Sequence, residues 1–180
     1  MNPYRLLSTR EIYRNPWVRL REDRIVRPDG KEHIFGVIEQ KAGSSVLALN
    51  SRDEAYLVRE YKYGIGRESL EVMSGGIEPG ETPLDAARRE LKEEAGLTAR
   101  DWLDLGVVDP FTTAVNSPNY IFLARDVEQG EREPDEGEYI EIVKLPFQEV
   151  VAMAMRGEIT HAASCVVILK VAAISAGWRA

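Results

Sequence analysis

Three glutamates, Glu90, Glu93 and Glu94, are spaced so that they would share one side of a helix. Like charges at this spacing cost a helix about 0.2–0.5 kcal/mol per pair, and the helix dipole disfavours anions in the second half of the helix. One interpretation is a solvated charged face, because neighbouring basic residues offset part of the repulsion. The other is a divalent cation site, because carboxylates that face one point supply the oxygen ligands that Mg²⁺ requires.

The segment around these glutamates carries the start and stop signals of a helix. Thr82 is suited to the N-cap, Pro83 to the first helical position and Gly96 to a left-handed residue at the C-terminal end. Apolar residues repeat at i, i+3 and i+7 and form the expected core face: Leu84, Ala87 and Leu91. We therefore expect a helix that begins after Thr82 and stops at Gly96.

Glycines upstream of this helix predict how the chain enters it. Gly75 and Gly76 predict a tight turn between a strand and the helix, which would leave carbonyl oxygens free to bind a cation. Gly80 predicts a second turn. Glu81 lies just before the helix, where we expect it to pair with Arg89 and orient the segment.

The order and spacing of these residues resemble the Nudix box, GX5EX7REUXEEXGU, in which U is aliphatic. Gly75, Glu81 and residues 89–97 (RELKEEAGL) match every fixed position. At background frequencies of about 5–7% per residue type, such a match arises by chance in on the order of one in 10⁷ chains of this size. The resemblance implies Mg²⁺-dependent hydrolysis of a nucleoside diphosphate linked to another moiety, with Mn²⁺ as a substitute cation.

The same resemblance assigns roles to the box residues. Glu90 and Glu94 stand one turn apart and are expected to be direct metal ligands. Glu93 is expected to be a further ligand or a group that positions water. The remaining fixed residues are expected to shape the box: Gly75, Glu81, Arg89 and Gly96.

Residues 57–63 (LVREYKY) and 70–76 (LEVMSGG) look like the ADP-ribose and nucleoside-diphosphate-sugar pyrophosphatase branch of this family, which reads roughly VRQYR…LELPAGG there. In that branch a basic residue on this strand contacts the diphosphate. The resemblance implies this role for Lys62, with Arg59 as a second candidate. A backbone carbonyl just before the first box glycine is a metal ligand in the branch, which implies Ser74.

An acidic loop late in the chain supplies a catalytic glutamate in this branch. The matching segment is residues 135–141 (DEGEYIE), which begins within an acidic, turn-rich stretch at residues 128–138. Glu138 is our first candidate and Glu136 our second. An ordinary polar loop is the alternative for both residues.

Two departures from the branch concern the substrate. Met73 replaces the usual proline before the glycines, and Thr113 stands where ADP-ribose hydrolases often carry a proline. We therefore expect residues 109–118 to be a different specificity element, and ADP-ribose and GDP-mannose both remain open as substrates. The alternatives are a Nudix hydrolase of dinucleotides such as NADH or diadenosine polyphosphates, one acting on an mRNA cap, or a non-catalytic nucleotide-sugar sensor.

The predicted fold class is α/β (α+β), a Nudix fold with a mixed β-sheet between helices. We expect residues 1–40 to form an N-terminal antiparallel extension of three strands, with a turn at residues 27–30. We expect residues 41–180 to form the Nudix domain. Two further helices are expected, from Pro146 to Gly157 and from about Thr160 to Ala176. The resemblance implies that the extension joins two subunits into a homodimer and brings aromatic side chains to the nucleobase. The candidates are Tyr13, Trp17 and Phe35, and for each of them a packing role is favoured over stacking on the base.

Composition limits the remaining classes of protein. The 180 residues are 44% hydrophobic, which is enough for a core, and carry a formal charge of −7, which disfavours nucleic acid held mainly by phosphate contacts. A lone cysteine, Cys165, excludes an intramolecular disulfide, and with two histidines a Cys/His zinc site is not expected. His33 and His161 are expected to be structural. Without a signal-like or membrane-spanning apolar run, we expect a cytoplasmic protein with no membrane partner.

Overall fold

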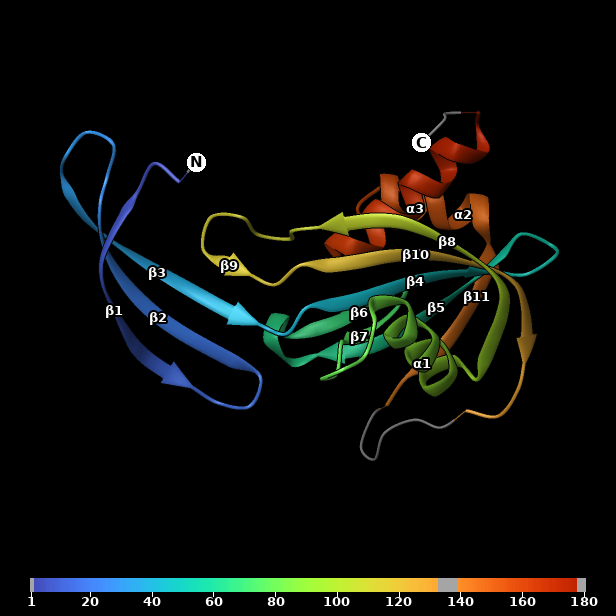
Figure 1. Ribbon diagram of the computed structural model, residues 1–180. Helices are drawn as coiled ribbons and strands as arrows, with labels where there is room; N and C mark the ends of the chain where they lie inside the picture. Colours follow the sequence, from blue (N-terminus) through green and yellow to red (C-terminus); the bar gives the residue numbers. More distant parts are fainter. Residues whose placement is uncertain (1, 133–138, 178–180) are drawn as a thin grey trace. The chain divides into compact units, whose positions relative to one another are not determined.

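The computed structural model describes residues 2–132 and 139–177 (Figure 1). The chain divides into two compact units. One comprises Met1–Ala42 and Asp109–Pro118, and the other comprises Gly43–Val108 and Asn119–Ala180. Residues 109–118 therefore belong to the same unit as the N-terminal strands.

The first unit is a four-stranded sheet in the order β1-β2-β3-β9. Its strands are β1 (Arg5–Arg14), β2 (Val18–Val26), β3 (Glu32–Gln40) and β9 (Val115–Asn116). The three predicted N-terminal strands are confirmed and are antiparallel, and Gly30 closes the β2–β3 turn with φ of 80°. The sequence did not predict β9, which pairs with β3 in parallel over two residues.

The second unit is built on a seven-stranded sheet in the order β11-β5-β4-β10-β8, with β6 on β5 and β7 on β4. Because β10 runs parallel to β4 and the other pairs are antiparallel, the sheet is mixed. A short 3-10 turn, η1 (Tyr63–Ile65), joins β5 to β6. The strands are β4 (Gly43–Leu49), β5 (Glu54–Lys62), β6 (Arg67–Glu71), β7 (Met73–Gly76), β8 (Leu97–Val108), β10 (Asn119–Gln129) and β11 (Glu141–Pro146).

Helices cover both faces of this sheet, as Figure 1 shows. Helix α1 (Pro83–Ala95) packs on one face, and α2 (Phe147–Met155) and α3 (Ala162–Ser175) pack on the other. Alternate residues of the central strands point to opposite faces of the sheet and pack into two separate hydrophobic cores. The core under α1 includes Val46, Ala48 and Phe122 with Leu91, and the core under α2 and α3 includes Leu47, Leu49 and Ile121 with Val167. The predicted fold class is confirmed.

The ends of α1 follow the sequence signals. Thr82 Oγ1 accepts the Asp85 N–H at 3.1 Å, and Gly96, with φ of 66°, donates its N–H to the Lys92 carbonyl at 2.8 Å. The turn predicted at Gly75–Gly76 is wrong, because both residues lie in β7 and neither has a positive φ. The chain turns instead at Gly80, whose φ is 87°. Among the described residues, no helix is long and apolar enough to cross a membrane.

Candidate functional site

Two glutamates of α1 lie against successive residues of β7. Glu94 is buried, and its Oε2 accepts the Ser74 N–H at 3.1 Å. Glu90, one turn earlier, places its carboxylate over Gly75. A Cβ added to Gly75 would lie 2.6 Å from Glu90 Oε2 and closer still to Oε1. Only glycine leaves room for the Glu90 carboxylate at this position.

Arg89 holds the acidic side chains of the segment together. Its Nε and Nη2 donate to both carboxylate oxygens of Glu81, at 3.0 and 3.1 Å, so the expected ion pair is present. Its Nη1 donates to Glu90 at 2.7 Å and to Glu93 at 2.9 Å, and Nη2 also reaches the Gly76 carbonyl at 2.9 Å. The hydrogen bonds to Glu81, and then those to Glu90 and Glu93, raise the pKa of Arg89. The arginine hydrogen bond in turn lowers the pKa of Glu81.

Lys62, at the end of β5, is brought to the same side of the sheet as these carboxylates. Burial alone would lower its pKa, but a hydrogen bond to Glu60 and the charges of Glu71, Glu60 and Glu94 raise it overall. Arg59 is three residues away on the same strand, so its side chain leaves from the opposite face. It forms an ion pair with Glu141 at 2.8 Å instead. The structure therefore groups Lys62, but not Arg59, with the box glutamates.

The donor set of this site suits a hard divalent cation, because it consists of carboxylate and backbone oxygens and Gly75 keeps space beside Glu90. Within the described part of the chain, no three Asp, Glu, His or Cys side chains already converge on one point. The hydrogen bonds explain this: Arg89 holds Glu90 and Glu93, and the Ser74 amide holds Glu94.

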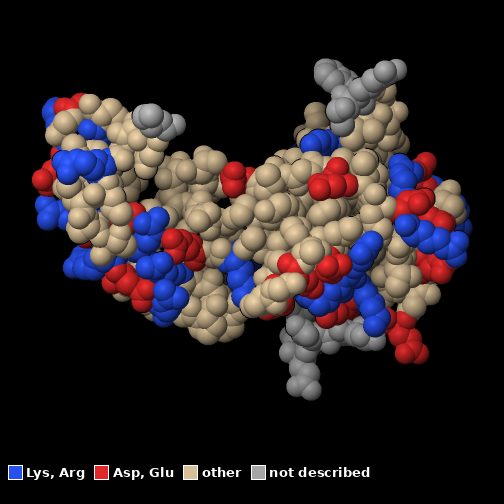
Figure 2. Space-filling view, in the orientation of Figure 1, with Lys and Arg blue, Asp and Glu red and all other residues tan. Residues whose placement is uncertain are grey.

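A cavity of about 510 Å³ lies between α1 and β8 and borders this site through Arg89 and Glu93. Its wall includes Trp102, and the Arg88 guanidinium lies over the Trp102 ring, 5.6 Å from the ring centroid. Basic and acidic side chains interleave on the surface over α1, as Figure 2 shows. The size of the cavity falls within the usual range for small-molecule sites.

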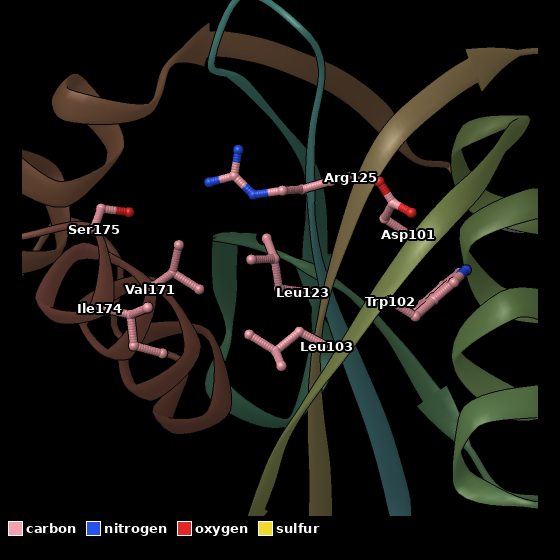
Figure 3. A pocket seen from close by; sticks show the side chains of 8 residues that line it. All are labelled: Asp101, Trp102, Leu103, Leu123, Arg125, Val171, Ile174 and Ser175. Atoms are coloured by element: carbon pink, nitrogen blue, oxygen red, sulfur yellow. The ribbon is translucent and has the colours of Figure 1, made fainter. Parts of the chain in front are cut away.

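A second cavity, of about 210 Å³, lies on the opposite face of the sheet, between α3 and the β8–β10 pair. Figure 3 shows Leu103, Leu123, Val171 and Ile174 converging on it, with the Arg125 guanidinium beside them. Arg125 is an exposed partner of Asp53 at 3.4 Å. This cavity has none of the box glutamates in its lining and is not a candidate for their chemistry.

The aromatic candidates in the first unit do not form one site. Trp17 is 71% exposed and precedes Val18, which pairs with Gln40. Phe35 lies five residues along β3 from Gln40, or about 17 Å at roughly 3.3 Å per residue. Phe35 packs edge-on against Tyr4 and His33, with ring centroids 6.0 and 5.4 Å away. Tyr13, which is exposed, accepts a hydrogen bond from Asn15.

Glu136 and Glu138 lie outside the described residues, but the chain on either side of them is anchored. Gly130 donates its N–H to the Gly96 carbonyl at 2.7 Å, directly after the end of α1. Arg132 Nη2 reaches the Ile140 carbonyl at 3.3 Å. The flanking residues are thus tied to the C-terminal end of the helix that carries the box glutamates.

Sequence reasoning missed a buried carboxylate at the end of β6 and its histidine partner. Glu71 is only 6% exposed, and its Oε2 lies 3.3 Å from His161 Nδ1. His161 also contacts Ser164 Oγ at 2.9 Å. The charged residue in the otherwise apolar run LEVM (residues 70–73) was a usable signal for Glu71, whereas nothing local to His161 indicates this contact.

Clustered glutamates on a helix, of which Glu94 is buried, an adjacent glycine and a mixed sheet between helices define this chain as a member of a known class. Residues 39–164 match the NUDIX domain family, and residues 4–38 match the nucleoside diphosphate sugar hydrolase N-terminal domain. The chain therefore belongs to the Nudix family and is a Nudix hydrolase.

Three similarities extend over most of the chain. It is 24% identical to the ADP-ribose pyrophosphatase of Bacillus subtilis (strain 168), over 87% of this chain and 85% of that protein. It is 26% identical to the ADP-ribose pyrophosphatase of Mycobacterium tuberculosis (strain ATCC 25618 / H37Rv), over 97% of this chain and 86% of that protein. The crystal structure of an ADP compounds hydrolase shares the fold, with a TM-score of 0.84 and 22% sequence identity. The similarity covers 98% of this chain and 97% of that one.

Proposed function

We propose that this chain hydrolyses the diphosphate bond of a nucleoside diphosphate sugar, releasing a nucleoside monophosphate and a sugar phosphate. The observation that carries the proposal is the cluster in which Arg89 gathers Glu90 and Glu93 beside Gly75, with Lys62 on the same face. The match of residues 4–38 to a nucleoside diphosphate sugar hydrolase domain supports the substrate class. ADP-ribose, named in two relatives, is the first substrate to test, and GDP-mannose the second.

In this proposal Glu90 and Glu94, with the Ser74 carbonyl, bind Mg²⁺, and Mn²⁺ can replace it. The cation would neutralise the diphosphate and activate water for attack on phosphorus. Glu93 binds a cation or orients the water. The oxygen of water bonds to one phosphorus while the bond from that phosphorus to the bridging oxygen breaks.

Lys62 places a positive charge beside the diphosphate, where charge develops on the phosphoryl oxygens. We assign the general base to Glu138, with Glu136 as the second choice. Arg59 can contribute only from the other face of the sheet, so we rank it below Lys62.

We also propose that the chain is a homodimer assembled through its first unit. Every residue of β1 is exposed, and the strand is the edge of its sheet. An edge strand with apolar side chains is a template for pairing with another chain. The exposed apolar residues of this strand are Leu6, Leu7, Ile12 and Tyr13. Because Trp17 and Phe35 lie far apart on one sheet, only one of them can stack on a given nucleobase from the same subunit.

The test is a panel of ADP-ribose, GDP-mannose, other nucleotide sugars, NADH and diadenosine polyphosphates, each with Mg²⁺ in ¹⁸O-labelled water. Product masses identify the substrate and the phosphorus that receives the label. Turnover of a nucleotide sugar supports the proposal. Turnover confined to dinucleotides would favour the alternative of a dinucleotide hydrolase, and the absence of multiple turnover on every compound would favour a non-catalytic nucleotide-sugar sensor.

A further inference from the structure

The cavity between α1 and β8 has a basic lining in an acidic chain. Three basic side chains, Arg88, Arg89 and Lys92, line it together with one carboxylate, Glu93, which gives the lining a formal charge of +2. The whole chain has a formal charge of −7. Glu93 already accepts a hydrogen bond from Arg89 at 2.9 Å. The cavity therefore favours an anionic ligand, because the local potential is set by the basic groups that line it.

Arg88 and Lys92 stand one helical turn apart on the side of α1 that borders the cavity. At this spacing the Cβ atoms are about 5–6 Å apart, so both side chains can reach the same phosphate group. The Arg88 guanidinium is stacked over the Trp102 ring, and its ion pair with Asp85 is long, at 3.5 Å. A guanidinium that is held over an indole before binding loses less rotamer freedom with an anion and still presents its planar fork of donors.

Another part of the wall is aromatic and apolar. Trp102 is half-buried, and its Nε1 donates to the Ala99 carbonyl at 3.2 Å, which fixes the orientation of the indole. Ala99 and the buried leucines Leu91 and Leu97 complete this part of the wall. A planar aromatic group packs well here, because the indole is already ordered before the ligand arrives. Inorganic phosphate or a sugar phosphate would pair with the basic residues but leave this wall without an apolar partner.

We propose that this cavity binds a nucleoside monophosphate, with the phosphate between Arg88 and Lys92 and the base against Trp102. Its volume of about 510 Å³ falls within the range of small-molecule sites. The proposed cation ligands Glu90 and Glu94 are absent from the lining that the structure describes, so the phosphate is held by basic side chains and needs no cation. AMP would also be a product of the proposed hydrolysis of ADP-ribose, but the inference rests on the cavity and not on that function.

The test measures the dissociation constant of AMP by titration calorimetry in the presence of EDTA, so that no divalent cation can hold the phosphate. The wild-type chain should bind AMP with a dissociation constant below about 1 mM. Trp102→Leu and Arg88→Gln should each weaken binding about tenfold, through loss of the contact with the base and of a charge-assisted hydrogen bond to the phosphate. Ribose 5-phosphate, which lacks the base, should bind at least about tenfold more weakly than AMP.

Arg156→Gln is the matched control for the loss of a positive charge. Arg156 follows α2, which packs on the other face of the sheet, and pairs with Glu158 at 2.6 Å. Its affinity for AMP should stay within about twofold of the wild type. Lys62→Met tests binding beside the box glutamates, and Trp17→Leu and Phe35→Leu test binding on the first unit. These three variants should bind AMP as the wild type does.

A wild-type chain that does not bind AMP would overturn the proposal. So would an affinity that falls in the variants beside the box glutamates or on the first unit but not in Trp102→Leu and Arg88→Gln, because the nucleotide would then occupy a different site. An equal loss in Arg156→Gln would reduce the effect of Arg88 to net charge, with the same consequence. If Trp102→Leu does not fold, the exposed Arg88 carries the test together with ribose 5-phosphate, and equal affinities for AMP and ribose 5-phosphate are the contrary result. The measurement needs neither a cation nor turnover, so its outcome is separate from that of the substrate panel.

Discussion

Replacing Gly75 by alanine tests whether the close approach of Glu90 to β7 is the active arrangement. Gly75 has no positive φ, so alanine is compatible with the backbone, but its Cβ would lie 2.6 Å from Glu90 Oε2. Ordinary contact needs about 3.5 Å, and Oε1 lies closer still than Oε2, so the carboxylate must retreat by more than about 1 Å. The atoms that must move are the end of a flexible side chain, and we expect a stability loss of only about 1–2 kcal/mol.

The effect on catalysis should be larger than the effect on folding. A 1 Å misplacement of a catalytic group costs about 10²-fold, which is about 2.7 kcal/mol in the barrier. The assay is kcat/KM with the substrate found in the panel, together with Mn²⁺ affinity by electron paramagnetic resonance and thermal unfolding. Both turnover and Mn²⁺ affinity should fall while the chain stays folded.

Gly64→Ala is the matched control, because its added Cβ meets nothing within 4 Å and its φ is not positive. This variant should keep activity and Mn²⁺ affinity within about twofold of the wild type, since nothing in the cluster has to move. If folded Gly75→Ala were as active as Gly64→Ala, the position of Glu90 against β7 would have no catalytic meaning.

Three further changes test other parts of the structure. Glu94→Gln should lower kcat by about 10²-fold or more with little change in thermal unfolding, and near-normal turnover would refute its assignment as a ligand. Asn50 donates to Glu54, and this hydrogen bond, with the charges of Arg52 and Lys144, lowers the pKa of Glu54 below 4.5. The stability that Glu54 contributes is therefore present above pH 4.5 and lost as the pH falls through its folded-state pKa. Urea unfolding should show a gap between the wild type and Glu54→Gln that shrinks below pH 4.5, and a gap that widens in acid would contradict this sign. Ile12→Lys should shift the mass in light scattering from twice the 20.2 kDa chain toward a single chain, and an unchanged mass would place the subunit contact elsewhere than β1.

Local signals predicted the elements of the fold well. Thr82, Pro83 and Gly96 fix the ends of α1 through contacts within a few residues, so the sequence alone contains the necessary information. The hairpin at Gly30 is local in the same way. Strand β9 was missed because it is two residues long and is defined only by its pairing with β3, which is distant in the sequence.

The candidate site was less predictable because its contacts are tertiary. The importance of Gly75 follows from its spacing, but the reason lies in a carboxylate one helix away rather than in a turn. The separation of Arg59 from Lys62 could have been predicted, since residues three apart on a strand face opposite sides. The contact between His161 and Glu71 could not, because 90 positions separate the two residues and only packing of α3 beside β6 joins them.

Arg89 explains how α1 tolerates carboxylates at i, i+3 and i+4. One planar guanidinium reaches Glu90 and Glu93 and still binds both oxygens of Glu81 and the Gly76 carbonyl. Lysine has a single ammonium and cannot span these directions. Because Glu81 and Gly76 lie outside the helix, they keep Arg89 in place even if Glu90 or Glu93 leaves it for a cation. The contacts of Arg89 with Glu81 and Gly76 therefore link α1 to β7 independently of Glu90 and Glu93.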